Sequence, residues 1–133
     1  MTVARGAFDI KMSPQSMAHA VEGSRLTRYS LDKQYHGDLV ATAIGEMFAA
    51  KPSEQSSAGY VAVEHVNGSL HGRRGTFILQ HSGTMTRGVP TLSVSVVPDS
   101  GTEDLAGLTG TLTIIIEGKK HFYEFEYALP VAR

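Results

Sequence analysis

Cysteine and tryptophan are absent from this sequence of 133 residues, and neither sign of charge is in excess. The lack of cysteine excludes a disulfide framework and a thiolate metal site, and it fits a reducing compartment. Twelve Lys and Arg residues against thirteen Asp and Glu residues give a net charge of -1. Because nothing in this balance attracts nucleic acid or an anionic membrane, we expect neither as a partner.

Long apolar runs are also missing. No stretch approaches the roughly 18 apolar residues that a membrane-spanning helix needs. Residues 1–11 contain no apolar run of signal-peptide length. We therefore expect a soluble, cytoplasmic protein. The length fits a single domain over 1–133, which is large enough for one sizeable core.

Helix signals are scarce, whereas alternation of apolar and polar residues is frequent. This alternation predicts strands over 7–12, 26–35, 39–49, 91–97 and 111–116. Two more strands flank a turn within 59–83, and an eighth follows a turn at Gly118 and Lys119. Counting outward from that last turn pairs Ile116 with His121, Ile114 with Tyr123 and Leu112 with Phe125.

The segments between these strands are short and rich in glycine, proline and small polar residues. We expect loops at 13–24, 51–57, 84–90 and 98–110. In the last of these loops, Leu105 and Leu108 are placed to fold back as a cap over an apolar end.

Eight short strands in consecutive hairpins predict an all-β protein, an eight-stranded antiparallel barrel with little or no helix. Closing the sheet is favourable because it removes both edges. The interior of such a barrel is filled by side chains or holds one small ligand. The strands also carry mixed outer faces, and we expect a homo-oligomer that covers them.

The clearest local signal is the stretch 59–83, in which two strands fold back on each other at His71-Gly72-Arg73-Arg74. If Gly72 and Arg73 form the loop, the predicted pairs are Leu70 with Gly75, Gly68 with Phe77, Val66 with Leu79 and Glu64 with His81. One face of the hairpin is then apolar until it ends in a carboxylate beside an imidazole.

Glu64 and His81 are the candidate catalytic residues. A carboxylate that is hydrogen-bonded to imidazole in an apolar cavity fixes the tautomer of the ring and tunes its pKa towards neutrality, as a general base requires. The alternative is a buried pair that satisfies its own hydrogen bonding and has no catalytic role, because buried polar groups are normally paired.

Further residues are candidates for binding a ligand. Glu46 joins the pair if the strands at 39–49 and 59–70 meet in an even register; otherwise it lies on a solvated outer face. Tyr60 and Tyr123 are possible hydrogen-bond donors, or else ordinary core tyrosines. Phe77, Leu79, Phe125 and the ring of Tyr123 are predicted to form an apolar wall.

No metal site or cofactor is expected. The six histidines, at positions 19, 36, 65, 71, 81 and 121, are scattered and show no HxH or HExxH spacing. Alternation along the strands also places His65 and His81 on opposite faces.

Three blocks carry a family resemblance: GYVAVEHVNGSLHGRRGTFILQHSGTM, the preceding GDLVATAIGEM, and VVPDSGTEDLAGLTGTLTI. They resemble an uncharacterised, mainly bacterial family of small domains of unknown function with an allene-oxide-cyclase-like β-barrel. The resemblance covers 6–129 and implies an eight-stranded barrel capable of self-association, with no established activity. The plant cyclases act on an unsaturated fatty-acid epoxide, but their catalytic residues do not align with positions here. Shared fold alone is weak support for shared chemistry.

Three functions remain open from the sequence. The first is a barrel that binds a small, partly apolar molecule whose polar end is fixed by Glu64 and His81. The second is an isomerase or cyclase in which the same pair transfers a proton. The third is a filled barrel without a ligand that acts through its oligomeric surface.

Overall fold

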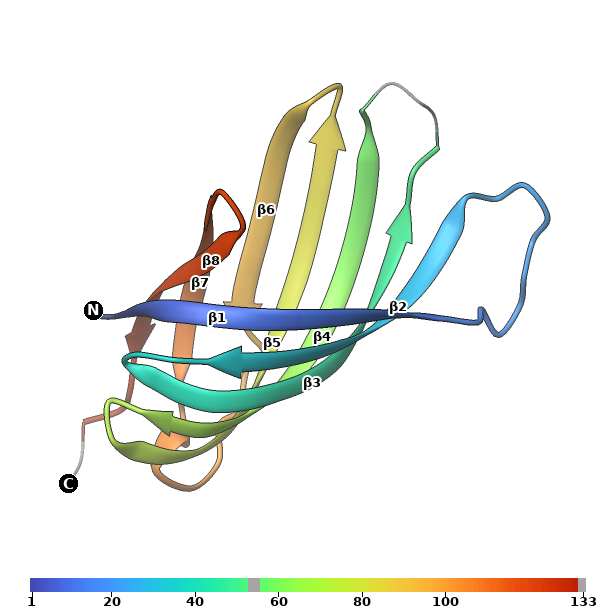
Figure 1. Cartoon of the computed structure of the whole chain (residues 1–133). Coiled ribbons are helices and arrows are strands. Elements are labelled where there is room, and N and C mark those ends of the chain that lie inside the picture. The colour runs from blue at the N-terminus through green and yellow to red at the C-terminus, as the bar shows by residue number, and fades with distance from the viewer. Residues whose placement is uncertain (53–55, 132–133) are drawn as a thin grey trace.

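The computed structural model describes residues 1–52 and 56–131 and shows a closed barrel of eight antiparallel strands, as predicted (Figure 1). Each strand pairs with its neighbour in sequence, and β1 pairs with β8 to complete the ring. Among the described residues, no helix is long and apolar enough to cross a membrane. The elements are β1 (Thr2–Gln15), β2 (Leu26–Tyr35), β3 (Leu39–Ala50), β4 (Ala58–Leu70), β5 (Arg73–Thr86), β6 (Val89–Val96), a 3-10 helix η1 (Glu103–Leu105), β7 (Thr109–Glu117) and β8 (Lys120–Ala128).

The strands predicted from alternation agree with the observed ones in number and order. The predicted strand 26–35 matches β2, and the three pairs predicted across Gly118 and Lys119 are all present. Strand β1 is longer than predicted at both ends, and it runs into the segment expected to be the loop 13–24. The loop predicted at 51–57 includes 53–55, which lie outside the described residues.

The prediction of a loop at 84–90 is wrong. Strand β5 continues through Thr86 and β6 begins at Val89, so Arg87 and Gly88 form a two-residue turn. Both residues have positive φ, 45° and 88°, as a tight hairpin turn of the primed type requires. Small polar residues and Pro90 suggested a loop, whereas cross-strand pairing extends almost to the turn itself.

The register predicted for the hairpin of β4 and β5 also needs correction. The turn residues are His71 and Gly72, both with positive φ, and not Gly72 and Arg73. Leu70 therefore lies opposite Arg73, and Glu64 lies opposite Leu79. The shift amounts to two residues on one strand. Because side chains alternate with a period of two, it leaves every side chain on its predicted face.

One end of the barrel is closed and packed. Phe77 and Phe125 stack there with ring centroids 5.8 Å apart, and both side chains are buried. Leu105 and Leu108 are also buried and cover this end, which confirms the predicted cap. Gly75 makes this close approach possible, because a Cβ there would lie 2.3 Å from the carbonyl oxygen of Thr102.

The opposite end of the barrel is splayed. Strands β6 and β7 meet at the pair Ser95 and Thr111, whereas β3, β4 and β5 pair along nearly their whole lengths. In Figure 1, β4, β5 and β6 rise together beyond β1 and beyond the hairpin of β7 and β8. We call this the open end. The inward-facing side chains of the tall strands are consequently not covered there by opposing strands.

Candidate functional site

A buried cluster of four side chains lies between the packed and the open parts of the barrel. It consists of Lys33 and Tyr35 on β2, Glu64 on β4 and His81 on β5. Oε2 of Glu64 accepts hydrogen bonds from Nζ of Lys33 at 2.7 Å and from Nε2 of His81 at 2.6 Å. Oε1 accepts a short hydrogen bond from the hydroxyl of Tyr35. All four residues are buried, so both carboxylate oxygens are satisfied within the protein.

The cluster holds Glu64 in its ionised form. Burial raises the pKa of this carboxyl, but the hydrogen bond from His81 and the charge of Lys33 outweigh burial and lower its pKa to about 2. The Nζ of Lys33 also lies 5.0 Å from the centre of the Phe8 ring, a favourable distance for a cation above an aromatic face. The two formal charges of the cluster cancel, which limits the penalty for burying them.

The depressed pKa of Glu64 predicts a loss of stability in acid. Ionised Glu64 contributes fully above pH 4.5, its ordinary pKa, and the contribution disappears as the pH falls towards about 2. The difference between these values corresponds to roughly 3 kcal/mol. Urea unfolding measured at several pH values between 6 and 2 should show this decline. The decline should be much shallower in Glu64→Gln, and an unchanged pH dependence in that variant would contradict the assignment.

The side chain of His81 has a second ring nitrogen that the cluster does not use. Nε2 donates to Glu64, and no hydrogen bond to Nδ1 is found among the described residues. No buried polar side-chain atom in the described part of the chain lacks a partner, so Nδ1 lies on the accessible edge of the ring. In the tautomer that donates from Nε2 to the carboxylate of Glu64, the ring presents Nδ1 as an acceptor.

The space above His81 exists because neighbouring inward positions carry small residues. Ala62 lies opposite His81 on β4, and Gly83 is the next inward residue along β5. A Cβ at Gly83 would lie 2.5 Å from the ring of Tyr60 and 3.2 Å from Leu92. Tyr60 and Leu92 therefore lean over Gly83 and flank the position above His81.

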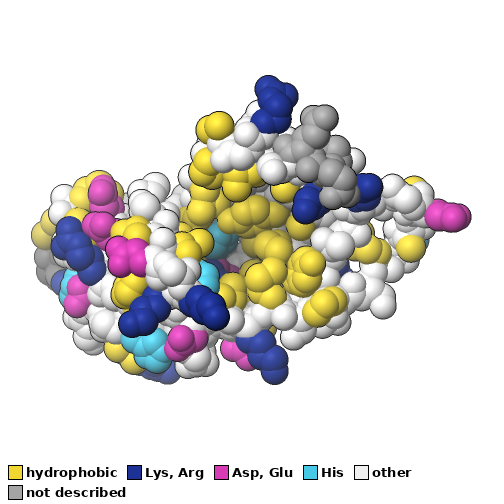
Figure 2. Space-filling model, turned by 45° about the horizontal axis from the view of Figure 1, so that its top comes forward, with side chains coloured by type: hydrophobic (Ala, Val, Ile, Leu, Met, Phe, Trp, Pro, Cys, Tyr) yellow, Lys and Arg dark blue, Asp and Glu magenta, His cyan; other side chains and the backbone are white. Residues whose placement is uncertain are grey.

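An apolar hollow opens above His81, at the open end of the barrel. Four inward-facing residues at the open end remain accessible, namely Met12 at 43%, Met85 at 38%, Leu92 at 42% and Ile116 at 63%. Figure 2 shows a hollow lined with hydrophobic side chains, with histidine side chains at its edge. Large apolar side chains that face the inside of a barrel are normally buried, so their exposure marks a concave apolar surface.

The structure places the other predicted site residues in different surroundings. Tyr60 is half-buried at the hollow, and burial raises the pKa of its hydroxyl. Phe77, Leu79, Tyr123 and Phe125 belong to the packed core, at most 1% exposed, and do not line the hollow. The Tyr123 hydroxyl donates to the carbonyl of His36 and accepts from the amide of Leu39, which fixes the turn between β2 and β3.

Glu46 does not join the cluster. Gly45 pairs with Glu64, so the register between β3 and β4 is odd and Glu46 faces outwards. Its carboxylate forms an exposed ion pair with Arg28 at 2.7 Å. The approach of β3 to β4 depends on Gly45, because a Cβ there would lie 2.1 Å from the carbonyl oxygen of Val63.

Lys33 and Tyr35 are the functional residues that sequence reasoning missed. Both follow Leu31 on the inward face of β2, in the alternating row that ends at the turn to β3. A lysine within an otherwise apolar, inward-facing row is the signal that identifies a buried charge, because lysine is rarely buried without a partner.

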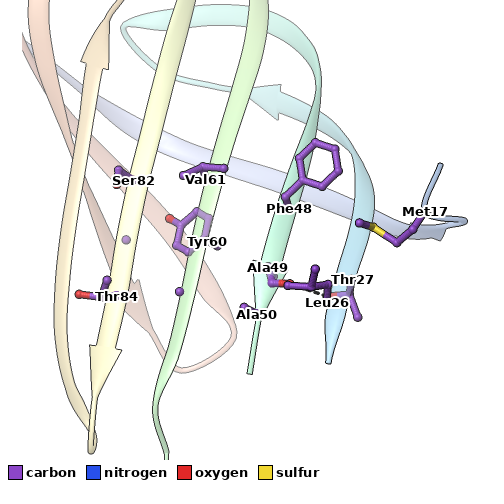
Figure 3. A pocket seen from close by; sticks show the side chains of 12 residues that line it. Met17, Leu26, Thr27, Phe48, Ala49, Ala50, Tyr60, Val61, Ser82 and Thr84 are labelled. Atoms are coloured by element: carbon purple, nitrogen blue, oxygen red, sulfur yellow. Dashed lines mark hydrogen bonds between the residues drawn. The ribbon is translucent and has the colours of Figure 1, made fainter. Parts of the chain in front are cut away.

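An apolar groove on the sheet is lined by outward-facing side chains and also by Tyr60, Gly83, Ala62 and His81. One hollow of about 390 Å³ is shown in Figure 3 and includes Met17, Leu26, Phe48 and Val61 in its lining. A second of about 460 Å³ adjoins it and shares Phe48, Val61 and Ser82. Outward-facing apolar residues on β3 and β4 are 48% to 70% exposed, namely Val40, Ile44, Phe48, Val61 and Val63. We call these five residues the outer patch.

Within the described residues, no group of three or more histidine, aspartate or glutamate side chains is arranged to hold a metal ion. The buried cluster itself contains one carboxylate, and Lys33 occupies one of the positions around it. The cluster pairs the charges of Lys33 and Glu64 and leaves Nδ1 of His81 without a hydrogen-bond partner among the described residues.

Comparison with known proteins identifies the family. The family model described as "Protein of unknown function (DUF3224)" matches residues 4–127. A crystal structure of a DUF3224 protein of unknown function from Shewanella oneidensis MR-1 is similar, with 46% identity, coverage of 99% of both chains and a TM-score of 0.93. No curated protein matches the chain. The likeness to allene oxide cyclases stays a prediction, whereas the barrel and the family are established: the chain belongs to the DUF3224 family.

Proposed function

We propose that this protein binds a small, partly apolar molecule in the hollow at the open end of the barrel. The observation that carries the proposal is the exposure of inward-facing apolar side chains, including Leu92 and Met85, directly beyond the buried cluster. A concave apolar surface with a few convergent polar groups is the usual form of a small-molecule site. Burying these side chains against a ligand would contribute about 25 cal/mol per Å² of apolar surface.

The packed part of the barrel restricts where such a ligand lies. Phe77, Leu79 and Phe125 fill the closed end, so the hollow is bounded below by the buried cluster and not by the base of the barrel. The ligand therefore enters from the open end and places its inner tip near His81 and Tyr60.

Binding is tested with a simple apolar probe, 2-methoxynaphthalene, followed by amide NMR shifts. We expect saturable shifts at Gly83, Leu92 and Ala62, which surround the hollow. Leu92→Arg should abolish them by placing a charge in the hollow, whereas Thr91→Arg on the outer face of the same strand should not. Native mass spectrometry of protein purified without added ligand then identifies a natural occupant. The absence of saturable shifts at the hollow would refute the proposal.

A second candidate is a proton-transfer reaction at the same place, as in an isomerase or cyclase. The hydrogen bond of 2.6 Å between Glu64 and His81 favours it, because the carboxylate stabilises the imidazolium that forms when Nδ1 takes a proton. A bound substrate should exchange hydrogen for deuterium in D₂O at the carbon that faces His81. His81→Phe should stop this exchange, and exchange at the wild-type rate in that variant would exclude His81 as the base.

We further propose that two copies of this chain associate through the outer patch. Five exposed apolar side chains lie on the outer face of β3 and β4, with Phe48 opposite Val61, and exposed apolar surface of this kind marks interaction sites. The charges beside it, Arg28 and Glu46, neutralise each other, so two identical faces do not repel. A two-fold contact between identical faces is the commonest form of protein dimer.

The association predicts a specific response to charge. Ile44→Glu in the outer patch should shift the protein from dimer to monomer in sedimentation equilibrium, because each copy would bury a carboxylate in the contact. Thr113→Glu, an exposed outward-facing position on β7, is the matched control outside the patch and should leave most of the dimer intact. A monomeric wild-type protein at high micromolar concentration would overturn this proposal.

A further inference from the structure

The buried cluster leaves one hydrogen-bonding atom for a ligand. Both oxygens of Glu64 are occupied by donors from the protein, and the ammonium group of Lys33 points to Glu64 and is covered by Phe8. Nε2 of His81 is also engaged. Of the ring nitrogens and carboxylate oxygens in the cluster, Nδ1 of His81 is the one without a hydrogen-bond partner among the described residues.

The geometry points to a ligand with an uncharged hydroxyl group at its inner end, and we propose that this hydroxyl donates a hydrogen bond to Nδ1 of His81. The inference rests on the proposed binding function and names the chemical class of its ligand as an apolar alcohol or phenol. Glu64 acts here as a positioning residue, because its bond to Nε2 fixes the tautomer in which Nδ1 is an acceptor.

Charge balance excludes the obvious alternatives. The charges of Lys33 and Glu64 cancel, and the tautomer of His81 that donates from Nε2 to Glu64 carries an acceptor at Nδ1. A carboxylate ligand would need a proton on Nδ1, which adds a new pair of charges in an apolar hollow and carries their desolvation penalty. A cationic ligand would meet a carboxylate whose charge Lys33 already balances and whose two oxygens both accept hydrogen bonds from the protein. A neutral donor adds no charge and satisfies the remaining acceptor.

Tyr60 supplies the second polar contact in this arrangement. Its ring lies against Gly83, the next inward residue beyond His81 on the same strand. No hydrogen bond from its hydroxyl is found among the described residues, and the side chain is half-buried at the hollow. A ligand hydroxyl that donates to Nδ1 of His81 can still accept a hydrogen bond on its oxygen. The hydroxyl of Tyr60, on the wall of the hollow, is the neighbouring donor for that bond.

The test compares three probes with the same ring system on the wild-type protein: 2-naphthol, 2-methoxynaphthalene and 2-naphthoate. We expect 2-naphthol to bind roughly 3- to 10-fold more tightly than 2-methoxynaphthalene, the gain of one neutral hydrogen bond. The naphthoate should bind more weakly than either at pH 8. Dissociation constants are measured from amide shifts at Gly83 and Ala62.

The outcomes separate the two proposals. If none of the probes shifts the hollow residues, the binding function fails. If 2-methoxynaphthalene binds and 2-naphthol shows no advantage, or 2-naphthoate binds most tightly, the binding function stands and the hydroxyl assignment is overturned. His81→Phe removes the acceptor and keeps a ring of similar size. In this variant 2-methoxynaphthalene should still bind, and the advantage of 2-naphthol should disappear; an advantage that persists would also overturn the assignment.

Discussion

Replacing Glu64 by glutamine is expected to lower the free energy of unfolding by about 3–5 kcal/mol, the typical effect of removing one partner of a buried ion pair. The amide has nearly the same shape, so packing is retained. Lys33, however, then keeps a buried charge without its carboxylate or must lose its proton. The amide also presents its NH₂ group either to Tyr35 or to Lys33 and His81, where a carboxylate oxygen accepted hydrogen bonds. Urea unfolding at pH 7 measures the effect.

Glu46→Gln is the matched control for this substitution. It removes the same charge from an exposed ion pair with Arg28, and such pairs contribute at most about 1 kcal/mol. A double variant, Lys33→Met with Glu64→Gln, should recover part of the loss because no unpaired charge remains buried. Equal effects of Glu64→Gln and Glu46→Gln would show that the buried cluster contributes no more than a surface pair.

Which site residues point into the barrel could be predicted from the sequence, because alternation determines the side of the strand on which each side chain lies. Glu64 and His81 were placed inside the barrel on this basis, and both are inside. Their pairing was wrong by two residues, since the turn is at His71 and Gly72. The error did not separate them, because diagonal neighbours on one face of a sheet remain within reach of long side chains.

The relation between β3 and β4 could not be obtained in this way. The two strands are joined through 51–57, and neither the length nor the composition of that connection defines a register. An even register would have brought Glu46 to the cluster, whereas the observed pairing of Gly45 with Glu64 turns it outwards. A shift of a single residue reverses the facing of a whole strand, so this contact depended on information that alternation does not contain.

The division of the barrel into a packed end and an open end also could not be predicted from the sequence. Alternation assigned Phe77, Leu79, Tyr123 and Phe125 to the inside correctly, but an inward side chain can line a cavity or fill it. The difference arises from where β6 and β7 stop pairing, at Ser95 and Thr111. Strand lengths and barrel closure together determine this, and neither is a local property of the chain.

Two substitutions at inward-facing positions should therefore have very different effects. Phe77→Ala is expected to destabilise the protein by about 3–5 kcal/mol, because the side chain is buried and stacks on Phe125, and its removal leaves a cavity. Leu92→Ala should change stability by less than about 1 kcal/mol, because this side chain already contacts solvent at the hollow. Chemical denaturation of both variants measures the difference.

The same pair of substitutions separates a filled barrel from a binding barrel. Leu92→Ala should weaken the binding of 2-methoxynaphthalene while leaving the fold nearly as stable as the wild type, because Leu92 flanks the hollow next to Gly83. If Leu92→Ala were instead as destabilising as Phe77→Ala, the open end would be packed in solution. The inward-facing apolar surface would then serve the core, and no hollow would remain for a ligand.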